Sequence, residues 1–374
     1  MSGWRKQSEH TSGRSRMDDT LAVIVLVLTV FGMVMLYSTS AYNGSVKFDD
    51  AGYYFKKQLL ATVLGLGVMY VVSRIDYRYW EKLALPAYIL SLVLSALVLA
   101  VGDSYNGSKR WLSLGPLSFQ PAEFAKVAVI LFLSWYISRR KKKIKSIGSL
   151  FQVIMLVLPI VGLVGTNNLS TAIIILGIAV ILVVVASPSY IQFAALGGLG
   201  TVFVGIFLAV EQYRLERLLI WRNPEAYEKG YQTLQGLYAI GSGGLFGTGF
   251  GNSMQKLGFV PEAQNDMIFS IICEELGLVG AGIILLLFGI MIWRFLIVSH
   301  GCDDLFGALI GAGILAHISI QVILNVAVVT NTIPNTGITL PFVSYGGTSV
   351  LFLLAEMGLA LNVSRHCRSE RNIS

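Results

Sequence analysis

The sequence predicts an all-α, polytopic membrane protein with about ten transmembrane helices, cytoplasmic N- and C-termini, and a large extracytoplasmic loop between helices 7 and 8. Composition is the first observation: of 374 residues, 55% are hydrophobic and 13% are charged, against about a quarter charged in an average soluble domain. The second is a series of apolar runs long enough to cross about 30 Å of hydrocarbon as helices. The third is the distribution of Lys and Arg.

Ten apolar runs are the predicted transmembrane helices, in the order 20–37, 58–73, 84–101, 121–138, 150–165, 170–186, 190–210, 267–297, 304–328 and 347–363. The second and fifth are short, and only residues 187–189 separate the sixth from the seventh, where Pro188 should break the helix. The chain thus divides into a cytoplasmic tail (1–19), expected to be disordered, a membrane domain (20–363) and a second cytoplasmic tail (364–374).

Basic residues favour the cytoplasmic side of short loops, so their distribution tests the predicted orientation. With the N-terminus inside, the inner segments hold 17 Lys and Arg residues and the outer segments hold ten. Most of the excess lies in residues 139–145, which we interpret as a topology anchor that contacts anionic membrane lipids. The net charge of +7 therefore requires no nucleic acid.

The large loop, residues 211–266, contains two partly amphipathic stretches, Glu211–Arg222 and Gly230–Ile240, which predict helices on the outer membrane face. Residues 241–251 follow, with six glycines in eleven positions. Two interpretations of this glycine-rich segment stay open. Its backbone amides could approach an anionic ligand, or it could be a flexible hinge.

Asp266 ends the loop and directly precedes the apolar run from Met267 to Ile297. An ionisable group at the edge of the membrane is costly and often marks a functional site. The alternative is helix capping, because Asn265 or Asp266 could satisfy free backbone N–H groups at the start of the helix. Both interpretations stay open at this point.

Glu123 and Lys126 follow Pro121, which suits the first turn of the fourth helix. Their spacing places them on one helical face and predicts an internal ion pair. That pair could simply let two charges tolerate membrane depth. Alternatively, it lines a polar cavity in which Lys126 or Arg110 faces a phosphate group.

Residues 331–337 and 341–349 are uncharged but rich in hydroxyls, prolines and glycines at membrane depth, which predicts a re-entrant loop. The remaining polar residues of the last three helices are Glu274, Glu275, His317, Gln321, Asn325 and Glu356. Inter-helix hydrogen bonding explains most of them at least as well as catalysis does. The sequence has no His-Glu-x-x-His zinc motif and no Gly-x-Ser-x-Gly elbow of a serine hydrolase.

Several motifs together resemble the SEDS family of shape, elongation, division and sporulation proteins, and within it the FtsW and SpoVE branch. They are Lys109–Leu112, Phe119–Lys126, Gly241–Gly244, Pro261–Asp266 and Pro341–Gly347, in matching order along nearly the whole chain after the N-terminal tail. The resemblance implies a peptidoglycan glycosyltransferase of the bacterial cytoplasmic membrane. Such an enzyme polymerises lipid II into glycan strands outside the membrane, for division or sporulation, and works with a class B penicillin-binding protein.

The resemblance also assigns roles to residues. It makes Asp266 the catalytic carboxylate, which we interpret as the general base of an inverting transfer. The candidate substrate-binding residues are Lys109, Arg110, Glu123, Lys126, Ser344 and Tyr345. No organic cofactor is expected, but a divalent cation, Mg²⁺ or Mn²⁺, could balance the pyrophosphate charge; its ligands are unknown.

This chain departs from the family pattern in two places. Gln264 and Asn265 replace a frequent His-Thr, and residues 166–172 lack the two acids and the proline of the usual Glu-Pro-Asp-x-Gly-Thr-Ala. Two other functions also fit the sequence: a flippase or transporter for lipid II, which ten helices and a polar cavity would suit, and a noncatalytic morphogenesis scaffold.

Overall fold

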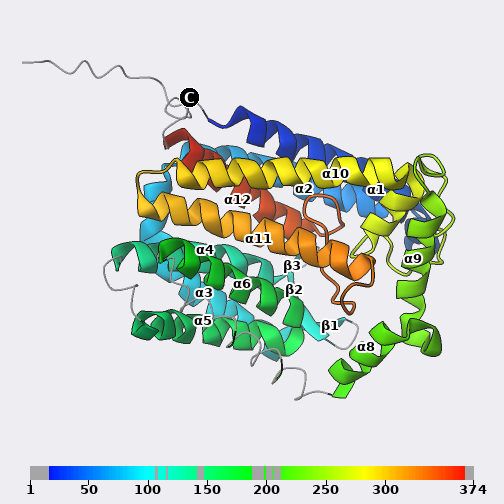
Figure 1. Cartoon of the computed structure of the whole chain (residues 1–374), viewed down its shortest axis with the longest axis horizontal. Coiled ribbons are helices and arrows are strands. Elements are labelled where there is room, and N and C mark those ends of the chain that lie inside the picture. The colour runs from blue at the N-terminus through cyan, green and yellow to red at the C-terminus, as the bar shows by residue number, and fades with distance from the viewer. Residues whose placement is uncertain are drawn as a thin grey trace, which may run out of the picture.

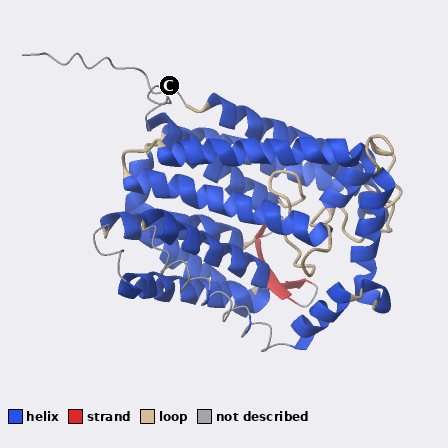
Figure 2. Cartoon of the chain, in the orientation of Figure 1, coloured by secondary structure: helices blue, strands red, loops and turns tan. Residues whose placement is uncertain are grey.

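The computed structural model describes residues 17–105, 108–114, 117–140, 147–187 and 212–366, and the single residues 198 and 205. Within these ranges the chain forms a bundle of long, roughly parallel helices (Figure 1). A small sheet and most of the long loops gather at one end of the bundle (Figure 2). Eight described helices are long and apolar enough to cross a membrane, which confirms the predicted fold class.

Nine of the ten predicted spans correspond to described helices. These are α1 (Asp19–Phe48), α2 (Tyr53–Arg74), α3 (Trp80–Val101), α4 (Pro121–Arg139), α5 (Ile147–Asn167), α6 (Leu169–Ala186), α10 (Ile268–His300), α11 (Leu305–Val329) and α12 (Gly347–His366). The seventh predicted span, residues 190–210, lies outside the described residues, as does most of the N-terminal tail. In the large loop, α8 (Gln212–Arg222) and α9 (Tyr231–Gly243) match the two predicted helices.

Two predicted boundaries were wrong. Helix α1 continues for eleven residues beyond residue 37, because Ser38 bonds to Glu275 and Asn43 bonds to Gln264 instead of facing lipid. Helix α2 begins at Tyr53 rather than at residue 58, where the Tyr53 ring stacks on Phe48 at the end of α1, with the ring centroids 3.7 Å apart. Polar and aromatic contacts between elements therefore extend these helices beyond the bounds that hydrophobicity alone predicts.

A three-stranded antiparallel sheet, which the sequence analysis did not anticipate, joins α3 to α4. Its strands are β1 (Asp103–Tyr105), β2 (Ser108–Leu114) and β3 (Leu117–Phe119), in the order β1-β2-β3. Such short strands carry little alternation of polar and apolar residues, so hydrophobic periodicity does not reveal them. The Thr348 hydroxyl at the start of α12 donates to the Ser118 carbonyl at 2.8 Å, which fixes the sheet against the bundle.

The interior of the bundle is built from α4, α11 and α12, each with more than 60% of its most apolar stretch buried, whereas the figure for α2 is 22%. The two ends of the described chain meet, because the Asp18 amide donates to Ser364 Oγ at 3.1 Å. The sheet and the loop helix α9 lie at the opposite end (Figure 1). The meeting of the two described ends agrees with the predicted placement of both termini on one side of the membrane. That this side is the cytoplasm stays a prediction.

Helix α10 is broken at Gly277, where φ is 67° and ψ is −171°. The glycine-rich segment fills the break: Thr248 and Gly249 donate their amides to the carbonyls of Glu274 and Glu275, at 2.9 and 3.1 Å. In return, the amides of Leu278 and Val279 donate to the carbonyls of residues 244 and 245. The segment is thus joined to the helix break through its own backbone, a contact that the sequence analysis did not anticipate.

We expect Gly277→Ala to destabilise the protein. A Cβ at this position would lie 2.3 Å from the Gly247 nitrogen, and its backbone conformation is nearly restricted to glycine, at a cost of about 2 kcal/mol for other residues. Thermal unfolding in detergent should show a lower Tm. The control is Gly282→Ala in the same helix, where a Cβ meets nothing within 4 Å. Equal Tm values for the two variants would contradict the structural role of the break.

Candidate functional site

Asp266 lies two residues before α10 and is surrounded by three other segments. Its Oδ1 accepts a long hydrogen bond, 3.4 Å, from Gln232 Nε2 of α9. Its backbone carbonyl accepts from Asn325 Nδ2 of α11 at 2.8 Å. Gly337 lies beside Oδ2, which an added Cβ would approach to 3.9 Å. Asp266 is not the N-cap residue of α10, since that position is held by Met267, whose side chain accepts no cap hydrogen bond.

The environment of Asp266 changes its acidity. The residue keeps some solvent exposure, but protein atoms surround its carboxylate, and this burial raises the pKa of Asp266 to about 6. The negative charge of Glu262 also raises the pKa, whereas hydrogen bonds from backbone amides and from Gln232 lower it. A carboxylate with a pKa close to the working pH is suited to accept a proton during a reaction.

A buried charged core lies deeper in the bundle. The predicted pair of Glu123 and Lys126 is confirmed, with Oε1 and Nζ 2.9 Å apart and both side chains almost fully buried. Lys126 Nζ also donates to Gln321 Oε1 at 3.3 Å. His317 lies between Gln321 Oε1, 2.9 Å from its Nε2, and Glu356 Oε2, 2.7 Å from its Nδ1. The core thereby joins α4, α11 and α12.

The hydrogen bonds of this core fix the orientation of its side chains. The Gln321 amide nitrogen donates to the Thr339 carbonyl at 3.0 Å, so the Gln321 oxygen faces His317 Nε2 and accepts from it. The other ring nitrogen of His317 contacts Glu356 Oε2, so both ring nitrogens have a partner in the buried core.

Helix α11 links the charged core to Asp266. Gln321 and Asn325 are one helical turn apart on the same face. Asn325 Nδ2 donates to the carbonyls of both Asp266 and Ile338, at 2.8 and 2.7 Å. The irregular segment 330–346 is thus tied to α11 at two successive residues, Ile338 and Thr339, and it lies against Asp266.

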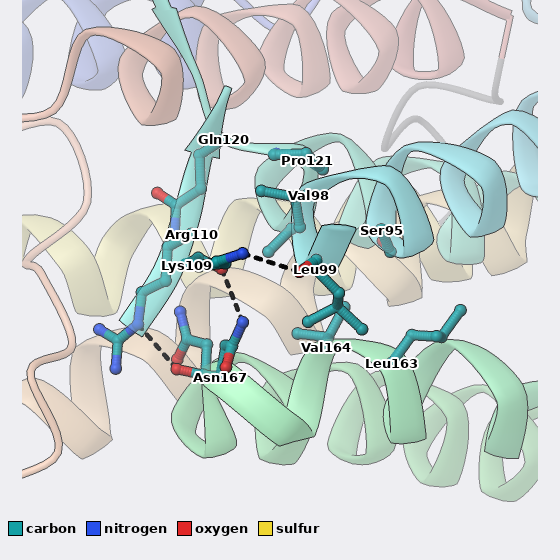
Figure 3. Close-up of a pocket in the computed structure, with 12 residues that line it drawn as sticks. Ser95, Val98, Leu99, Lys109, Arg110, Gln120, Pro121, Leu163, Val164 and Asn167 are labelled. Atoms are coloured by element: carbon teal, nitrogen blue, oxygen red, sulfur yellow. Dashed lines mark hydrogen bonds between the residues drawn. The ribbon is translucent and has the colours of Figure 1, made fainter. Parts of the chain in front are cut away.

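Lys109 and Arg110 lie in a different pocket, between α3, α4, α5 and β2 (Figure 3). Arg110 Nε donates to the Asn167 carbonyl at 2.7 Å, and Asn167 Nδ2 donates to the Lys109 carbonyl at 2.8 Å. Lys109 Nζ reaches the Ala100 carbonyl at 3.2 Å, near the C-terminus of α3. The structure therefore does not bring these two predicted substrate contacts together with Glu123 and Lys126.

The same pocket gives a physical account of one departure from the family pattern. Asn167 holds β2 through the contacts described above. Asn168 caps α6, since its side-chain oxygen accepts from the Thr171 amide at 3.1 Å. Asn168 therefore caps α6 with an amide oxygen at the position of the usual aspartate, and Asn167 binds β2 at the position of the usual proline.

Ser344 and Tyr345 belong to the segment that lies against Asp266. The Ser344 hydroxyl accepts from the Leu340 amide at 2.8 Å and closes a turn. The Tyr345 amide donates to the Gln264 carbonyl at 2.9 Å, and its ring meets Tyr54 edge to face, with the centroids 5.0 Å apart. Burial raises the pKa of the Tyr345 phenol to about 12. Contact of either residue with substrate stays a prediction.

Sequence reasoning missed Gln232, which contacts Asp266, and Lys256, which pairs with Glu275 at 2.6 Å. A signal for Lys256 was present, because two adjacent carboxylates inside an apolar helix require a cation or donors from elsewhere. The preceding loop offers Lys256 as such a cation. No comparable signal pointed to Gln232.

The fold and the site define an integral membrane protein that carries a carboxylate of raised pKa above a buried charged core. The family model described as the cell cycle protein FtsW/RodA/SpoVE matches residues 19–369. The chain therefore belongs to this family, in agreement with the resemblance drawn from its motifs, and is a multi-pass protein of the bacterial cytoplasmic membrane.

Relatives and solved structures agree with this assignment. The chain is 39% identical to stage V sporulation protein E of Bacillus subtilis (strain 168), over 96% of this chain and 100% of the relative. It is 35% identical to a probable peptidoglycan glycosyltransferase FtsW of Trichlorobacter lovleyi, over 93% of each.

Among solved structures, a chain of a peptidoglycan synthase complex that coordinates polymerization and crosslinking matches with a TM-score of 0.79 and 30% identity, covering 93% of this chain and 98% of that one. The rod shape determining protein RodA of Thermus thermophilus matches with a TM-score of 0.70 and 29% identity, covering 95% and 98%.

Proposed function

We propose that this protein polymerises lipid II into glycan strands at the outer face of the cytoplasmic membrane, by an inverting transfer in which Asp266 is the general base. The observation that carries the proposal is the Asp266 carboxylate itself, held between α9, α11 and segment 330–346 with its pKa raised to about 6. Family membership supports it, because several relatives are named peptidoglycan glycosyltransferases. The chain is accordingly an enzyme of peptidoglycan synthesis.

In the proposed reaction, a sugar hydroxyl of one lipid-linked unit attacks the anomeric carbon of another. Asp266 accepts the hydroxyl proton as the new C–O bond forms, and the polyprenyl pyrophosphate departs with the electrons of the broken bond. A single displacement converts an α-linked donor into a β-linked polymer. Arg110 would meet the leaving pyrophosphate only if the donor extends into the separate pocket between α3, α4, α5 and β2, while Lys126, bound to Glu123, acts on the site only through the buried core.

We propose a divalent cation only as one that binds together with the pyrophosphate of the substrate. The described residues contain no group of three His, Cys, Asp or Glu side chains that could hold a metal ion. Mg²⁺ in phosphate sites is commonly held by one or two carboxylates together with substrate phosphates, so Mg²⁺ or Mn²⁺ would arrive with the pyrophosphate.

We also propose that a class B penicillin-binding protein is the partner that crosslinks the new strands. The structural match to a chain of a peptidoglycan synthase complex supports this pairing. Residues of the lipid-facing helices α2 and α3, which are largely exposed, meet membrane lipids.

The direct test uses the purified full-length protein with such a partner and fluorescent lipid II. We expect glycan polymer with β linkages. If lipid II crosses vesicle membranes and no polymer forms, the transporter function replaces the proposed one. If neither activity occurs and Asp266→Ala still supports growth or sporulation of a null strain, the scaffold function replaces it.

The pKa of Asp266 predicts a pH dependence of the reaction. A general base must be deprotonated, so kcat/KM should rise about tenfold per pH unit below pH 6 and level off above it. Glu262→Gln removes a negative charge that raises this pKa, so the acidic limb should move to lower pH in that variant. Rates measured from pH 4.5 to pH 8, with ~0.5 unit steps, check both points; a flat profile would contradict the role of Asp266.

A further inference from the structure

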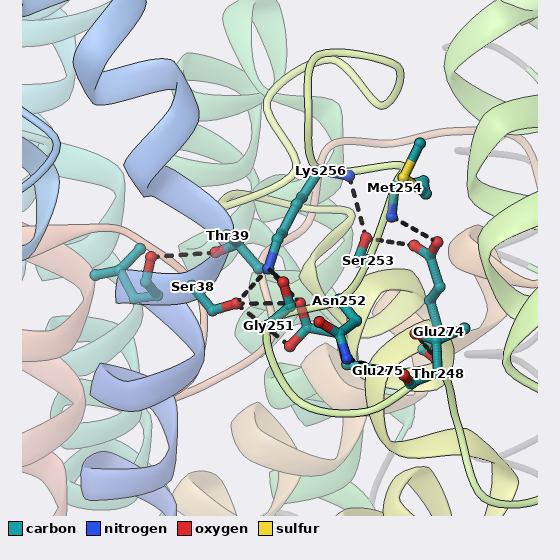
Figure 4. Close-up of polar contacts among 11 residues, drawn as sticks. Ser38, Thr39, Thr248, Gly251, Asn252, Ser253, Met254, Lys256, Glu274 and Glu275 are labelled. Carbon is teal, nitrogen blue, oxygen red and sulfur yellow. Dashed lines mark hydrogen bonds and ion pairs between the residues drawn. The ribbon is translucent and has the colours of Figure 1, made fainter.

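A second buried ion pair lies where the large loop meets α1 and α10 (Figure 4). Lys256 Nζ is 2.6 Å from Glu275 Oε1, and both side chains are more than nine-tenths buried. Lys256 Nζ also donates to Ser38 Oγ of α1 at 2.8 Å and to the Gly251 carbonyl at 2.7 Å. Ser38 Oγ in turn lies 3.1 Å from Glu275 Oε1. One ammonium group therefore joins α1, the loop and α10.

The neighbouring carboxylate strengthens the same junction. Glu274 accepts a hydrogen bond from the Ser253 hydroxyl and another from the Met254 amide at 3.0 Å. Glu274 and Glu275 lie three and two residues before the break of α10 at Gly277. Their side chains thus hold the loop at residues 253–256, while their backbone carbonyls hold it at residues 248–249.

From this junction the loop runs along α1 toward Asp266. Gly258 packs against the Tyr42 ring, which an added Cβ would approach to 3.0 Å. Further along, Gln264 Oε1 accepts from Asn43 Nδ2 at 2.9 Å. Ser38, Tyr42 and Asn43 lie within two turns of one helix. The loop therefore packs along α1 over this stretch, and these contacts fix the position of the residues that lead to Asp266.

We propose that Lys256, Glu275 and Ser38 are positioning residues for the glycosyl transfer, which fix the loop on α1 and α10 and thereby set the place of the Asp266 carboxylate. The inference rests on the proposed role of Asp266. It adds three residues that touch no reacting atom and act through the loop. A displacement of about 1 Å at a reacting group can lower a rate substantially, so loosening this junction should be visible in turnover.

Ser38→Ala is the most informative variant, because it removes the bridge to α1 without leaving a buried charge unpaired. We expect kcat for lipid II polymerisation by the full-length protein with its partner to fall about three- to tenfold, with KM nearly unchanged. The acidic limb of the pH–rate profile should also move to lower pH, because a looser loop exposes Asp266 to water. A mere loss of folded protein would lower kcat without moving that limb.

Ser45→Ala is the matched control, since the exposed Ser45 hydroxyl donates to the Ala41 carbonyl of its own helix and, within the described part of the chain, to no other element. Its kcat and pH limb should stay as in the wild type. The double variant Lys256→Met with Glu275→Gln removes both charges together and should lower kcat further than Ser38→Ala does. If both Ser38→Ala and the double variant keep wild-type kcat and pH limb while Asp266→Asn is inactive, the positioning inference is overturned and the proposed function stands. If Asp266→Asn itself is fully active, the proposed function fails instead.

Discussion

Asp266→Asn should lower the rate of lipid II polymerisation by about 10²- to 10⁴-fold, the usual contribution of a general base. Asn has nearly the same shape as Asp and can still contact Gln232, but it cannot accept a proton. Because the backbone carbonyl of Asp266 bonds to Asn325, the local fold should survive the change. KM for lipid II should therefore change little compared with kcat.

The measurement is polymer formed per minute by purified protein and partner, with Glu262→Gln as the control. Glu262 lies on the same loop, four residues earlier, and its substitution keeps the reacting carboxylate. We expect this control to retain most of its activity near pH 7. An Asp266→Asn enzyme that makes glycan as fast as the wild type would remove the basis of the mechanism.

Lys126→Met should cause the largest loss of stability. The change leaves the Glu123 carboxylate buried, with Oε1 deprived of its partner and Oε2 already lacking a hydrogen bond. Breaking one partner of a buried ion pair costs about 3–5 kcal/mol. It also removes one of the two donors at Gln321, so segment 330–346 should loosen as well.

Thermal unfolding in detergent, followed by the loss of monodisperse protein, measures this effect. The double variant Glu123→Gln with Lys126→Met should recover much of the lost Tm, because no buried charge is left unpaired. Lys56→Met serves as the exposed control: it breaks a surface pair with Asp50 and should barely change Tm. If Lys126→Met had the same Tm as Lys56→Met, the buried ion pair of Glu123 and Lys126 would not contribute to the stability of the fold.

Much of the fold could be predicted because the features that make a segment a transmembrane helix lie within that segment. A helix such as α6 needs a long apolar run and a residue that caps its start, and both are present in residues 168–186. The ion pair of Glu123 and Lys126 was also predictable, since both partners lie on one helix at a fixed spacing. The helix ends were less predictable, as α1 shows, because partners on other elements decide how far a polar stretch stays helical.

The candidate site was only partly predictable. Asp266 stood out because a carboxylate at the edge of an apolar run is unusual. Nothing local to Gln232 or Asn335 points to Asp266, although Gln232 contacts both Asp266 and Asn335 in the structure. The contacts of the glycine-rich segment were not predictable for the same reason, since its hydrogen-bond partners are backbone groups of a helix that begins some twenty residues later.

That this protein is a helical membrane protein follows from its amino-acid sequence, because hydrophobicity and helix length are properties of single segments. The family motifs and the position of a carboxylate at the membrane edge also follow from it. The packed structure was needed to show which groups surround that carboxylate, that Lys109 and Arg110 line a separate pocket, and that Lys256 ties the loop to α1 and α10. These depend on contacts between residues up to 237 positions apart, and the free energy of such contacts is defined only once the helices have packed.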